Sequence, residues 1–179
     1  MSDYSISFVP KQSIFPNPQE KANEIFEWLV SKDIIKPFLS DCILSSQKGF
    51  SISDGAKKVC LFPNDLPFNL RTNGVEIITE RQVFDTGENG IEELICPICG
   101  VNIAVKDWDL NSWDSGGSDN IKCTNCDVES EINKFHFSPE WGFSNLGFTF
   151  WNWPEFNTDF IKEFEQKMGC TLTIVYQHI

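Results

Sequence analysis

The sequence predicts an α+β domain in which a largely antiparallel sheet carries two helices on one face. Three observations support this prediction. Short alternating or apolar runs recur along the chain, as they do in strands. Two longer segments carry apolar residues at helical spacing. Four cysteines in two pairs lie between these groups and indicate an inserted four-cysteine zinc ribbon. A ferredoxin-like arrangement is one topology that fits the order of the elements.

Most of the predicted elements lie in the first half of the chain. Residues 5–9 alternate between serine and apolar side chains and predict a strand that Pro10 ends. Asn17 and Pro18 are typical of a helix start, and an apolar stripe follows them to about Ser31. Further short strands are expected at residues 41–44, 50–53, 59–62, 74–79, 131–137 and 171–176.

The run over residues 141–154 is apolar on both faces, which is typical of a central strand. Its alternation places Trp151 and Trp153 on the same face. A second helix is expected to begin with a cap at Asn157 or Thr158, and Gly169 is a natural C-terminal stop for it.

The expected organisation is one α+β domain with one insertion. Residues 1–84 and 131–179 form the domain, and residues 85–130 form the zinc-ribbon hairpin. A chain of 179 residues is long enough to bury one sizeable core. The sequence contains no internal repeat of fixed period and no low-complexity tract.

The strongest motif is a pair of CxxC knuckles, with Cys96 and Cys99 in the first and Cys123 and Cys126 in the second. Two such knuckles can place four thiolates around one Zn²⁺. Because thiolates would fill all four positions, no vertex remains for water or substrate, and the zinc is expected to be structural. The alternative is that the cysteines merely lie close together or are oxidised in pairs. Gly100 favours zinc, because the turn after the second thiolate commonly needs a positive φ.

The other three cysteines, Cys42, Cys60 and Cys170, are expected to be reduced and buried. The total of seven is odd, which argues against a disulfide scaffold. The first residues lack the basic and apolar regions of a secretory signal, and no apolar run is long enough to span a bilayer. These features predict a cytoplasmic protein with no membrane contact.

The chain is strongly acidic, with a formal charge of −12. Four thiolates and one Zn²⁺ would change this value to −14. Such a surface repels phosphate backbones and attracts cationic partners. Between the knuckles lie four aspartates and only two lysines, whereas a ribbon that binds nucleic acid usually carries basic residues at its tip. The charge therefore predicts a basic protein partner and disfavours nucleic acid.

The residues expected to bind this partner lie at the tip of the insertion: Asp107, Trp108, Asp109, Trp113 and Asp114. The tryptophans would be aromatic anchors and the aspartates a polar rim. The alternative is that both tryptophans cover the small core of the ribbon itself. A calcium loop beginning at Asp107 is excluded, because its sixth residue is not Gly and its twelfth is not Glu.

Common enzyme signatures are absent from the sequence. It has no phosphate-binding loop, no dinucleotide fingerprint, no H-E-x-x-H motif and no G-x-S-x-G motif. The two histidines, His136 and His178, have no recognisable nucleophile near them in sequence. The sequence therefore predicts no catalytic residue.

The run over residues 141–154, together with the stretch from Cys96 to Gly100, resembles a family of small, uncharacterised bacterial proteins that contain a zinc ribbon. The similarity covers nearly the whole chain. Members are sometimes labelled as a sugar ABC transporter ATPase, but without a phosphate-binding loop and its lysine no ATPase site can be assigned here. The resemblance implies a bacterial cytoplasmic protein and supplies no catalytic residue.

From these observations we expect a non-enzymatic, acidic protein-interaction module. One concrete version is an immunity or antitoxin-like protein that neutralises a basic enzyme such as a nuclease. One alternative is an enzyme of unrecognised type with a carboxylate-lined cleft. Another is a nucleic-acid-associated ribbon protein, for which Lys57, Lys58, Arg71 and Arg81 would have to gather on one face. A further reading is that the acidity only confers solubility.

Overall fold

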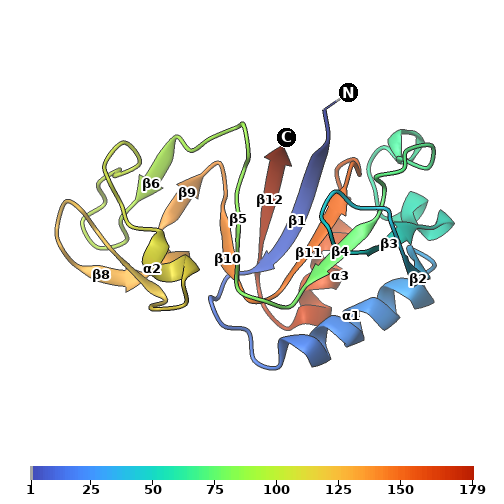
Figure 1. The fold of residues 1–179 in the computed structure, drawn as a ribbon, viewed down its shortest axis with the longest axis horizontal. Coiled ribbons are helices and arrows are strands. Elements are labelled where there is room, and N and C mark those ends of the chain that lie inside the picture. Colours follow the sequence, from blue (N-terminus) through green and yellow to red (C-terminus); the bar gives the residue numbers. More distant parts are fainter. Residues whose placement is uncertain (1) are drawn as a thin grey trace.

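The computed structural model describes residues 2–179, and in them it contains one six-stranded sheet and three two-stranded ladders (Figure 1). The six-stranded sheet, called the main sheet below, has the strand order β12-β1-β11-β4-β3-β2, and every neighbouring pair is antiparallel. This confirms the predicted α+β class. No helix of the described residues is long and apolar enough to cross a membrane.

The order of the elements explains the topology of the main sheet. β1 and β4 are parallel with β11 between them, and β11 and β12 are parallel with β1 between them. These are two interleaved split βαβ units, as in a ferredoxin-like arrangement, with the β2–β3 hairpin added beside β4. The strands are β1 (Tyr4–Pro10), β2 (Ile35–Ser40), β3 (Gly49–Ile52), β4 (Val75–Ile78), β11 (Gly147–Trp151) and β12 (Leu172–His178).

Each unit contains one helix between its two parallel strands, α1 (Pro18–Ser31) in the first and α3 (Thr158–Met168) in the second. The side chain of Asn157 caps α3 by accepting a hydrogen bond from the Phe160 backbone N–H at 2.8 Å, and Gly169 ends the helix with a φ of 73°. Asn17 precedes α1 but makes no side-chain cap, since its backbone is left-handed with a φ of 51°. The start of α1 therefore depends on Pro18 and not on an asparagine cap.

The larger apolar core lies between the two helices and one face of the main sheet (Figure 1). Trp28 of α1 stacks on Phe160 of α3 with ring centroids 5.7 Å apart, and it meets Phe164 edge to face at 5.5 Å. Phe8 of β1 packs against Phe164 at 4.9 Å. Both helices therefore cover the same face, as the sequence predicts.

Two strands predicted before residue 63 are wrong, and one strand of the main sheet was not predicted. Residues 41–44 form no strand, and residues 59–62 contribute only an isolated bridge between Cys60 and Phe156. The unpredicted strand is β2, which contains Pro37 and exposes Phe38. An edge strand tolerates both features, because one side of its backbone is unpaired.

Residues 2–179 also contain three short 3₁₀ helices, η1 (Asp54–Lys58), η2 (Pro63–Asp65) and η3 (Ile132–Lys134).

The predicted central strand over residues 141–154 is divided into β10 (Gly142–Ser144) and β11. β11 is fully buried on both faces, as expected for a central strand. After it, Asn152 adopts a φ of 62° and turns the chain. Trp153 therefore enters the helix-side core, where its ring lies 5.2 Å from that of Phe150, and it does not share a face with Trp151.

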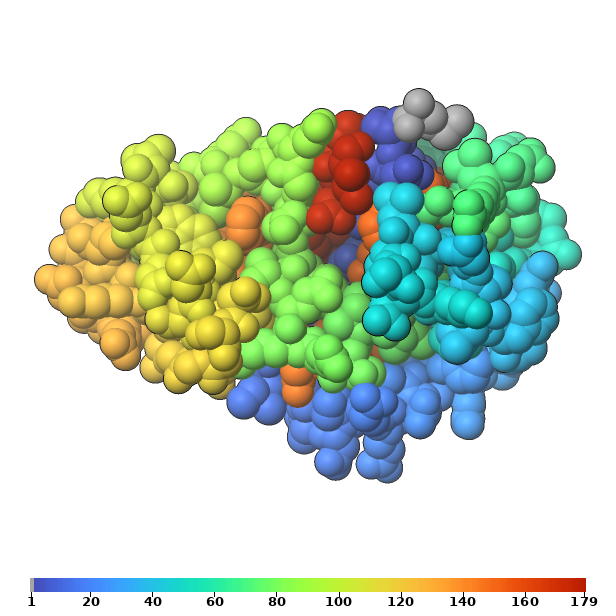
Figure 2. Space-filling model, in the orientation of Figure 1, coloured from blue at the N-terminus to red at the C-terminus, as the bar shows by residue number. Residues whose placement is uncertain are grey.

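A second apolar core surrounds the four motif cysteines and defines the cysteine lobe, residues 83–143. The lobe forms one end of the molecule (Figure 2). It includes Phe143, so it extends beyond the predicted boundary at residue 130. The predicted strand over residues 131–137 is broken by η3. Besides η3, the lobe contains β5 (Gln82–Phe84), β6 (Glu93–Ile95), α2 (Asn111–Asp114), β7 (Asn120–Lys122), β8 (Glu129–Glu131), β9 (His136–Ser138) and β10. The first residue of β5 and the last residue of β10 lie just outside it.

The β5–β10 ladder lies between the cysteine lobe and the helix-free face of the main sheet. Val83 and Phe143 pair in this ladder and face the cysteine lobe. Their neighbour Phe84 faces the main sheet, where it packs with Val9. The alternation of a strand therefore attaches the lobe to the sheet face that carries no helix.

Gly147 of β11 is the contact point for this attachment, and we expect Gly147→Ala to destabilise the protein. A Cβ at this position would overlap Cζ of Phe84, so the Phe84 ring would have to move. Overpacking of this kind destabilises by about 1–3 kcal/mol. Urea unfolding measures the effect, and Gly117→Ala, whose Cβ has its nearest contact at 3.4 Å, is the matched control. Equal midpoints for the two variants would contradict the packing described here.

Candidate metal centre

The four cysteines of the two knuckles converge in the structure. Their sulfur atoms all lie within 4.8 Å of one another. Sγ of Cys96 is 3.9 Å from Sγ of Cys126, and Sγ of Cys99 is 3.8 Å from Sγ of Cys123. A tetrahedral site with metal–sulfur bonds of about 2.3 Å has edges of about 3.8 Å. These two of the six sulfur–sulfur distances match that edge length, and the cluster can hold a metal ion.

The two knuckles share one backbone geometry. The carbonyl of each first cysteine accepts a hydrogen bond from the residue four positions later, Gly100 at 3.0 Å and Asp127 at 2.9 Å. The N–H of each first cysteine donates to the carbonyl five positions later, Val101 at 3.1 Å and Val128 at 3.0 Å. Gly100 and Asp127 both have a positive φ, 70° and 61°. The positive φ predicted at Gly100 is confirmed, and an aspartate fills the same role in the second knuckle.

N–H groups of both knuckles point at the sulfurs. The backbone N–H of Ile98 donates to Cys96 Sγ at 3.4 Å, and that of Asn125 donates to Cys123 Sγ at 3.4 Å. The side-chain amide of Asn125 donates to Cys99 Sγ at 3.6 Å. Such donors favour the charged thiolate, which is the form that binds a metal.

As thiols, Cys99, Cys123 and Cys126 differ in the direction of their pKa shifts. The Val101 backbone N–H is the largest influence on Cys99 and helps to lower its pKa to about 7. Burial raises the pKa of Cys123, but N–H groups of its own knuckle lower it below the ordinary value. The Val128 N–H lowers the pKa of Cys126, but burial and the neighbouring thiols together outweigh it and raise the pKa to about 11. A metal ion must therefore displace protons when it binds, so its affinity should rise with pH.

The four sulfurs differ in their access to solvent. Cys96 and Cys123 are buried against the core of the lobe, with exposed fractions of 1% and 0%. Cys99 and Cys126 are partly exposed. The metal site therefore has an inner pair of ligands that belongs to the lobe's core and an outer pair that faces water.

The other three cysteines lie away from this cluster. Cys42 and Cys60 are buried, and Cys170 is partly exposed. Burial raises the pKa of Cys60 to about 12 and also raises that of Cys170. The prediction of a buried cysteine is confirmed for Cys42 and Cys60 and is wrong for Cys170.

The structure separates the five residues predicted to bind a partner. Trp113 is 0% exposed, and its indole N–H donates to the Ser13 hydroxyl at 2.8 Å. The prediction that Trp113 contacts a partner is therefore wrong, since this residue belongs to the core of the lobe. Trp108 is partly buried and meets Phe137 edge to face at 6.0 Å. The alternative, in which the tryptophans cover the ribbon's own core, holds fully for Trp113 and largely for Trp108.

The three aspartates of the predicted partner site, Asp107, Asp109 and Asp114, remain exposed. Asp109 is also engaged locally, because its carboxylate accepts a hydrogen bond from the Ser112 hydroxyl at 2.5 Å. This hydrogen bond is the main cause that lowers the pKa of Asp109. Asp107 and Asp114 are therefore the members of the predicted set that are placed to meet a partner.

Arg81 joins the cysteine lobe to the rest of the chain, a role that the sequence did not indicate. Its guanidinium lies 3.9 Å from the centroid of the Trp113 ring and donates to the Asp119 carboxylate at 2.7 Å. It also donates to the backbone carbonyls of Trp113 at 2.6 Å and Ser118 at 2.8 Å. Because these partners are more than 30 positions away in sequence, no local pattern could have identified this contact.

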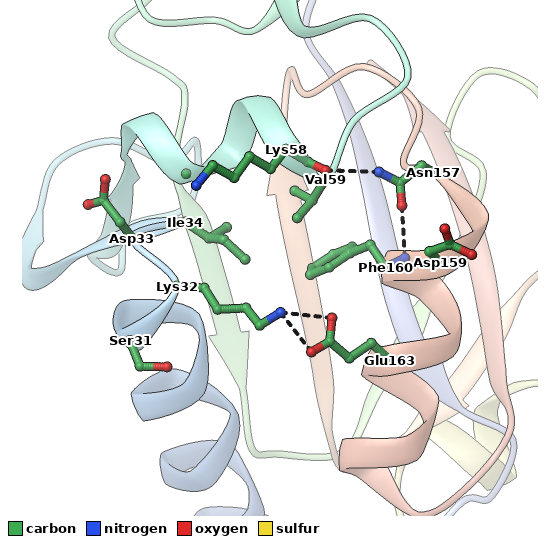
Figure 3. Close-up of a pocket in the computed structure, with 11 residues that line it drawn as sticks. Ser31, Lys32, Asp33, Ile34, Lys58, Val59, Asn157, Asp159, Phe160 and Glu163 are labelled. Atoms are coloured by element: carbon green, nitrogen blue, oxygen red, sulfur yellow. Dashed lines mark hydrogen bonds and ion pairs between the residues drawn. The ribbon is translucent and has the colours of Figure 1, made fainter.

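One cavity, of about 560 Å³, lies between the end of α1, η1 and the start of α3 (Figure 3). Glu163 on its rim is paired with Lys32 at 2.7 Å. Asp33 and Asp159 are both exposed and lie on opposite sides of the cavity in Figure 3. The carboxylates of this cavity are therefore paired or in contact with solvent, and none is buried.

Comparisons of the chain with protein-family models, with curated proteins and with solved structures find no match. The family resemblance described above therefore stays a prediction.

Proposed function

We propose that this chain is a non-enzymatic, acidic protein-binding module whose four-cysteine cluster holds a structural Zn²⁺. The observation that carries the proposal is a closed set of four sulfurs that braces the most acidic part of the chain. Tetrahedral sulfur ligands are typical of zinc and of iron–sulfur centres, and the two-knuckle spacing favours zinc. Zinc bound in this way would stabilise the cysteine lobe and would leave no vertex for catalysis.

The charge of the lobe supports a basic partner. Residues 85–130 contain ten acidic and two basic side chains, a formal charge of −8 before any metal is counted. Most of these carboxylates are exposed. A field of one sign on a rigid protrusion speeds the encounter with a cationic protein and selects against anionic ones. An immunity or antitoxin-like protein that binds a basic enzyme in the cytoplasm is the most concrete form of this proposal.

The nucleic-acid alternative has less support, because three of the four cations that it needs are paired with carboxylates. Arg81 is stacked on Trp113 of the cysteine lobe and paired with Asp119, so it is not free to bind a phosphate. The ion pairs join Lys57 to Asp54, Arg71 to Asp41 and Arg81 to Asp119.

The enzyme alternative would need a cleft with buried carboxylates or a base beside a nucleophile. The cavity between α1, η1 and α3 offers neither, since its acids are exposed or paired. His136 is half exposed, and its ring lies 3.7 Å from the Glu93 carboxylate. The observations therefore favour binding over catalysis.

Two measurements test the proposal. Metal analysis of the full chain should give about one equivalent of zinc. The immobilised chain should then capture a basic protein from the native cell, and added salt should weaken the capture. Asp107→Lys with Asp114→Lys should abolish the capture, whereas Glu20→Lys with Glu27→Lys makes the same charge change on α1 and should preserve it. Capture of no basic protein, or equal loss in both variants, would contradict the proposal.

A further inference from the structure

Asn125 contacts sulfur atoms of both knuckles. Its backbone N–H donates to Cys123 Sγ, in its own knuckle, at 3.4 Å. Its side-chain amide donates to Cys99 Sγ, in the other knuckle, at 3.6 Å. These two sulfurs are only 3.8 Å apart. One residue thus supplies two N–H donors across one edge of the cluster.

The first knuckle has no equivalent of this contact. Ile98 occupies the matching position, and its backbone N–H donates to Cys96 Sγ at 3.4 Å. Its side chain is apolar and 62% exposed, so it cannot donate to a sulfur of the second knuckle. Among the hydrogen bonds of residues 2–179, no side-chain amide donates to Cys126. The two outer sulfurs, Cys99 and Cys126, are therefore protected unequally.

An amide donor changes how an exposed metal thiolate behaves. It withdraws electron density from the sulfur, which makes the sulfur less nucleophilic, and it holds the sulfur in the ligand position. Residues that orient ligands in this way typically change metal affinity by about 10–100-fold when they are removed. Because Cys99 is partly exposed, a reagent can reach its sulfur, and the donor lowers the reactivity that the reagent meets there.

We propose that Asn125 is a positioning residue of the metal centre, which ties the two knuckles together and protects the sulfur of Cys99. The inference rests on the proposed function only in that it requires a bound metal. Neither the partner nor the acidic surface enters it.

The first test measures the release of zinc. The zinc-loaded full chain is mixed with an excess of the chelator 4-(2-pyridylazo)resorcinol, and transfer of the metal is followed by absorbance. We expect Asn125→Ala to release zinc roughly 10-fold faster than the wild type. Thr124→Ala, an exposed change in the same knuckle, is the control and should match the wild type. Asn125→Asp keeps the size but replaces the amide donor with a negative charge, so it should release zinc at least as fast as Asn125→Ala.

The second test locates the effect on one sulfur. Iodoacetamide alkylates a thiolate by forming a sulfur–carbon bond while the carbon–iodine bond breaks and iodide leaves. At low extents of reaction, mass spectrometry of the zinc-loaded protein gives the share of modification at each cysteine. Asn125→Ala should raise the share at Cys99 relative to Cys126, which is the internal reference.

The outcomes separate this inference from the proposed function. Zinc bound at one equivalent, with release and alkylation in Asn125→Ala equal to the wild type, overturns the role of Asn125 and leaves the metal centre standing. A wild-type chain that binds no zinc overturns both. Faster release with an unchanged share at Cys99 also overturns the inference, because protection of that sulfur is part of it.

Discussion

Cys123→Ser is expected to abolish zinc binding and to unfold the cysteine lobe while the main sheet stays largely folded. Cys123 is an inner ligand with no exposed surface, so no water can reach the vertex that the serine hydroxyl fails to fill. Structural zinc contributes directly to folding, and the core of the lobe is much smaller than that between the helices and the main sheet. Cys99→Ser should also lose zinc, since it removes an outer ligand of the same set.

Metal analysis and tryptophan fluorescence measure this result. Zinc should fall from about one equivalent to almost none. The emission of Trp113, in the lobe, should shift to the red, whereas far-ultraviolet circular dichroism should keep most of its helix signal, because α1 and α3 lie on the main sheet. Cys170→Ser changes a cysteine outside the cluster and is the control. Full zinc retention by Cys123→Ser would show that the four sulfurs do not act as one site.

Trp113→Ala is expected to destabilise the protein by about 3–5 kcal/mol, the range for removing a large buried aromatic side chain. The Trp113 ring is fully buried and packs edge to face on Phe143 at 5.3 Å. The same side chain is stacked by Arg81 and donates to Ser13, a residue outside the lobe. Removing it would therefore open a cavity in the lobe and would also loosen the lobe's attachment to the rest of the chain.

Urea unfolding of three variants separates these contributions. Trp113→Phe keeps most of the packing but loses the hydrogen bond to Ser13, so it should cost about 1 kcal/mol beyond any packing change. Trp108→Ala removes a tryptophan that is only partly buried and should cost less than Trp113→Ala. If Trp108→Ala lowered the free energy of unfolding more than Trp113→Ala, the burial of Trp113 would not explain its contribution to stability.

The parts of the fold that could be predicted from sequence are those that local residues determine. Helix α3 has both a capping Asn157 and a terminating Gly169 next to its own apolar stripe. The knuckles are local as well, because two cysteines three positions apart fix the turn between them. β2 could not be predicted, because Pro37 and an exposed Phe38 break the strand pattern, and only its place at the sheet edge makes them acceptable.

The candidate site shows the same limit. The four cysteines that can hold a metal ion are the complete set that the motif indicated. Whether the Trp113 side chain points into the core or into solvent could not be predicted, because an aromatic residue in an acidic loop is typical of a partner surface and of a small core alike. Its inward position depends on Ser13 and Arg81, which lie 100 and 32 residues away in sequence. The role of Asn125 also required the structure, because its side chain crosses to a cysteine of the other knuckle.

The pairing of β4 with β11 has a consequence for folding kinetics. Ile78 and Gly147 are cross-strand neighbours, yet residues 79–146 lie between them in sequence. Bringing the two ends of so long a segment together is entropically unfavourable, although the penalty grows only with the logarithm of its length. If zinc condenses the intervening segment first, the span that must close becomes shorter, and each halving saves about 0.6 kcal/mol. We therefore expect a bound zinc ion to accelerate the pairing of β4 with β11, although it contacts neither strand.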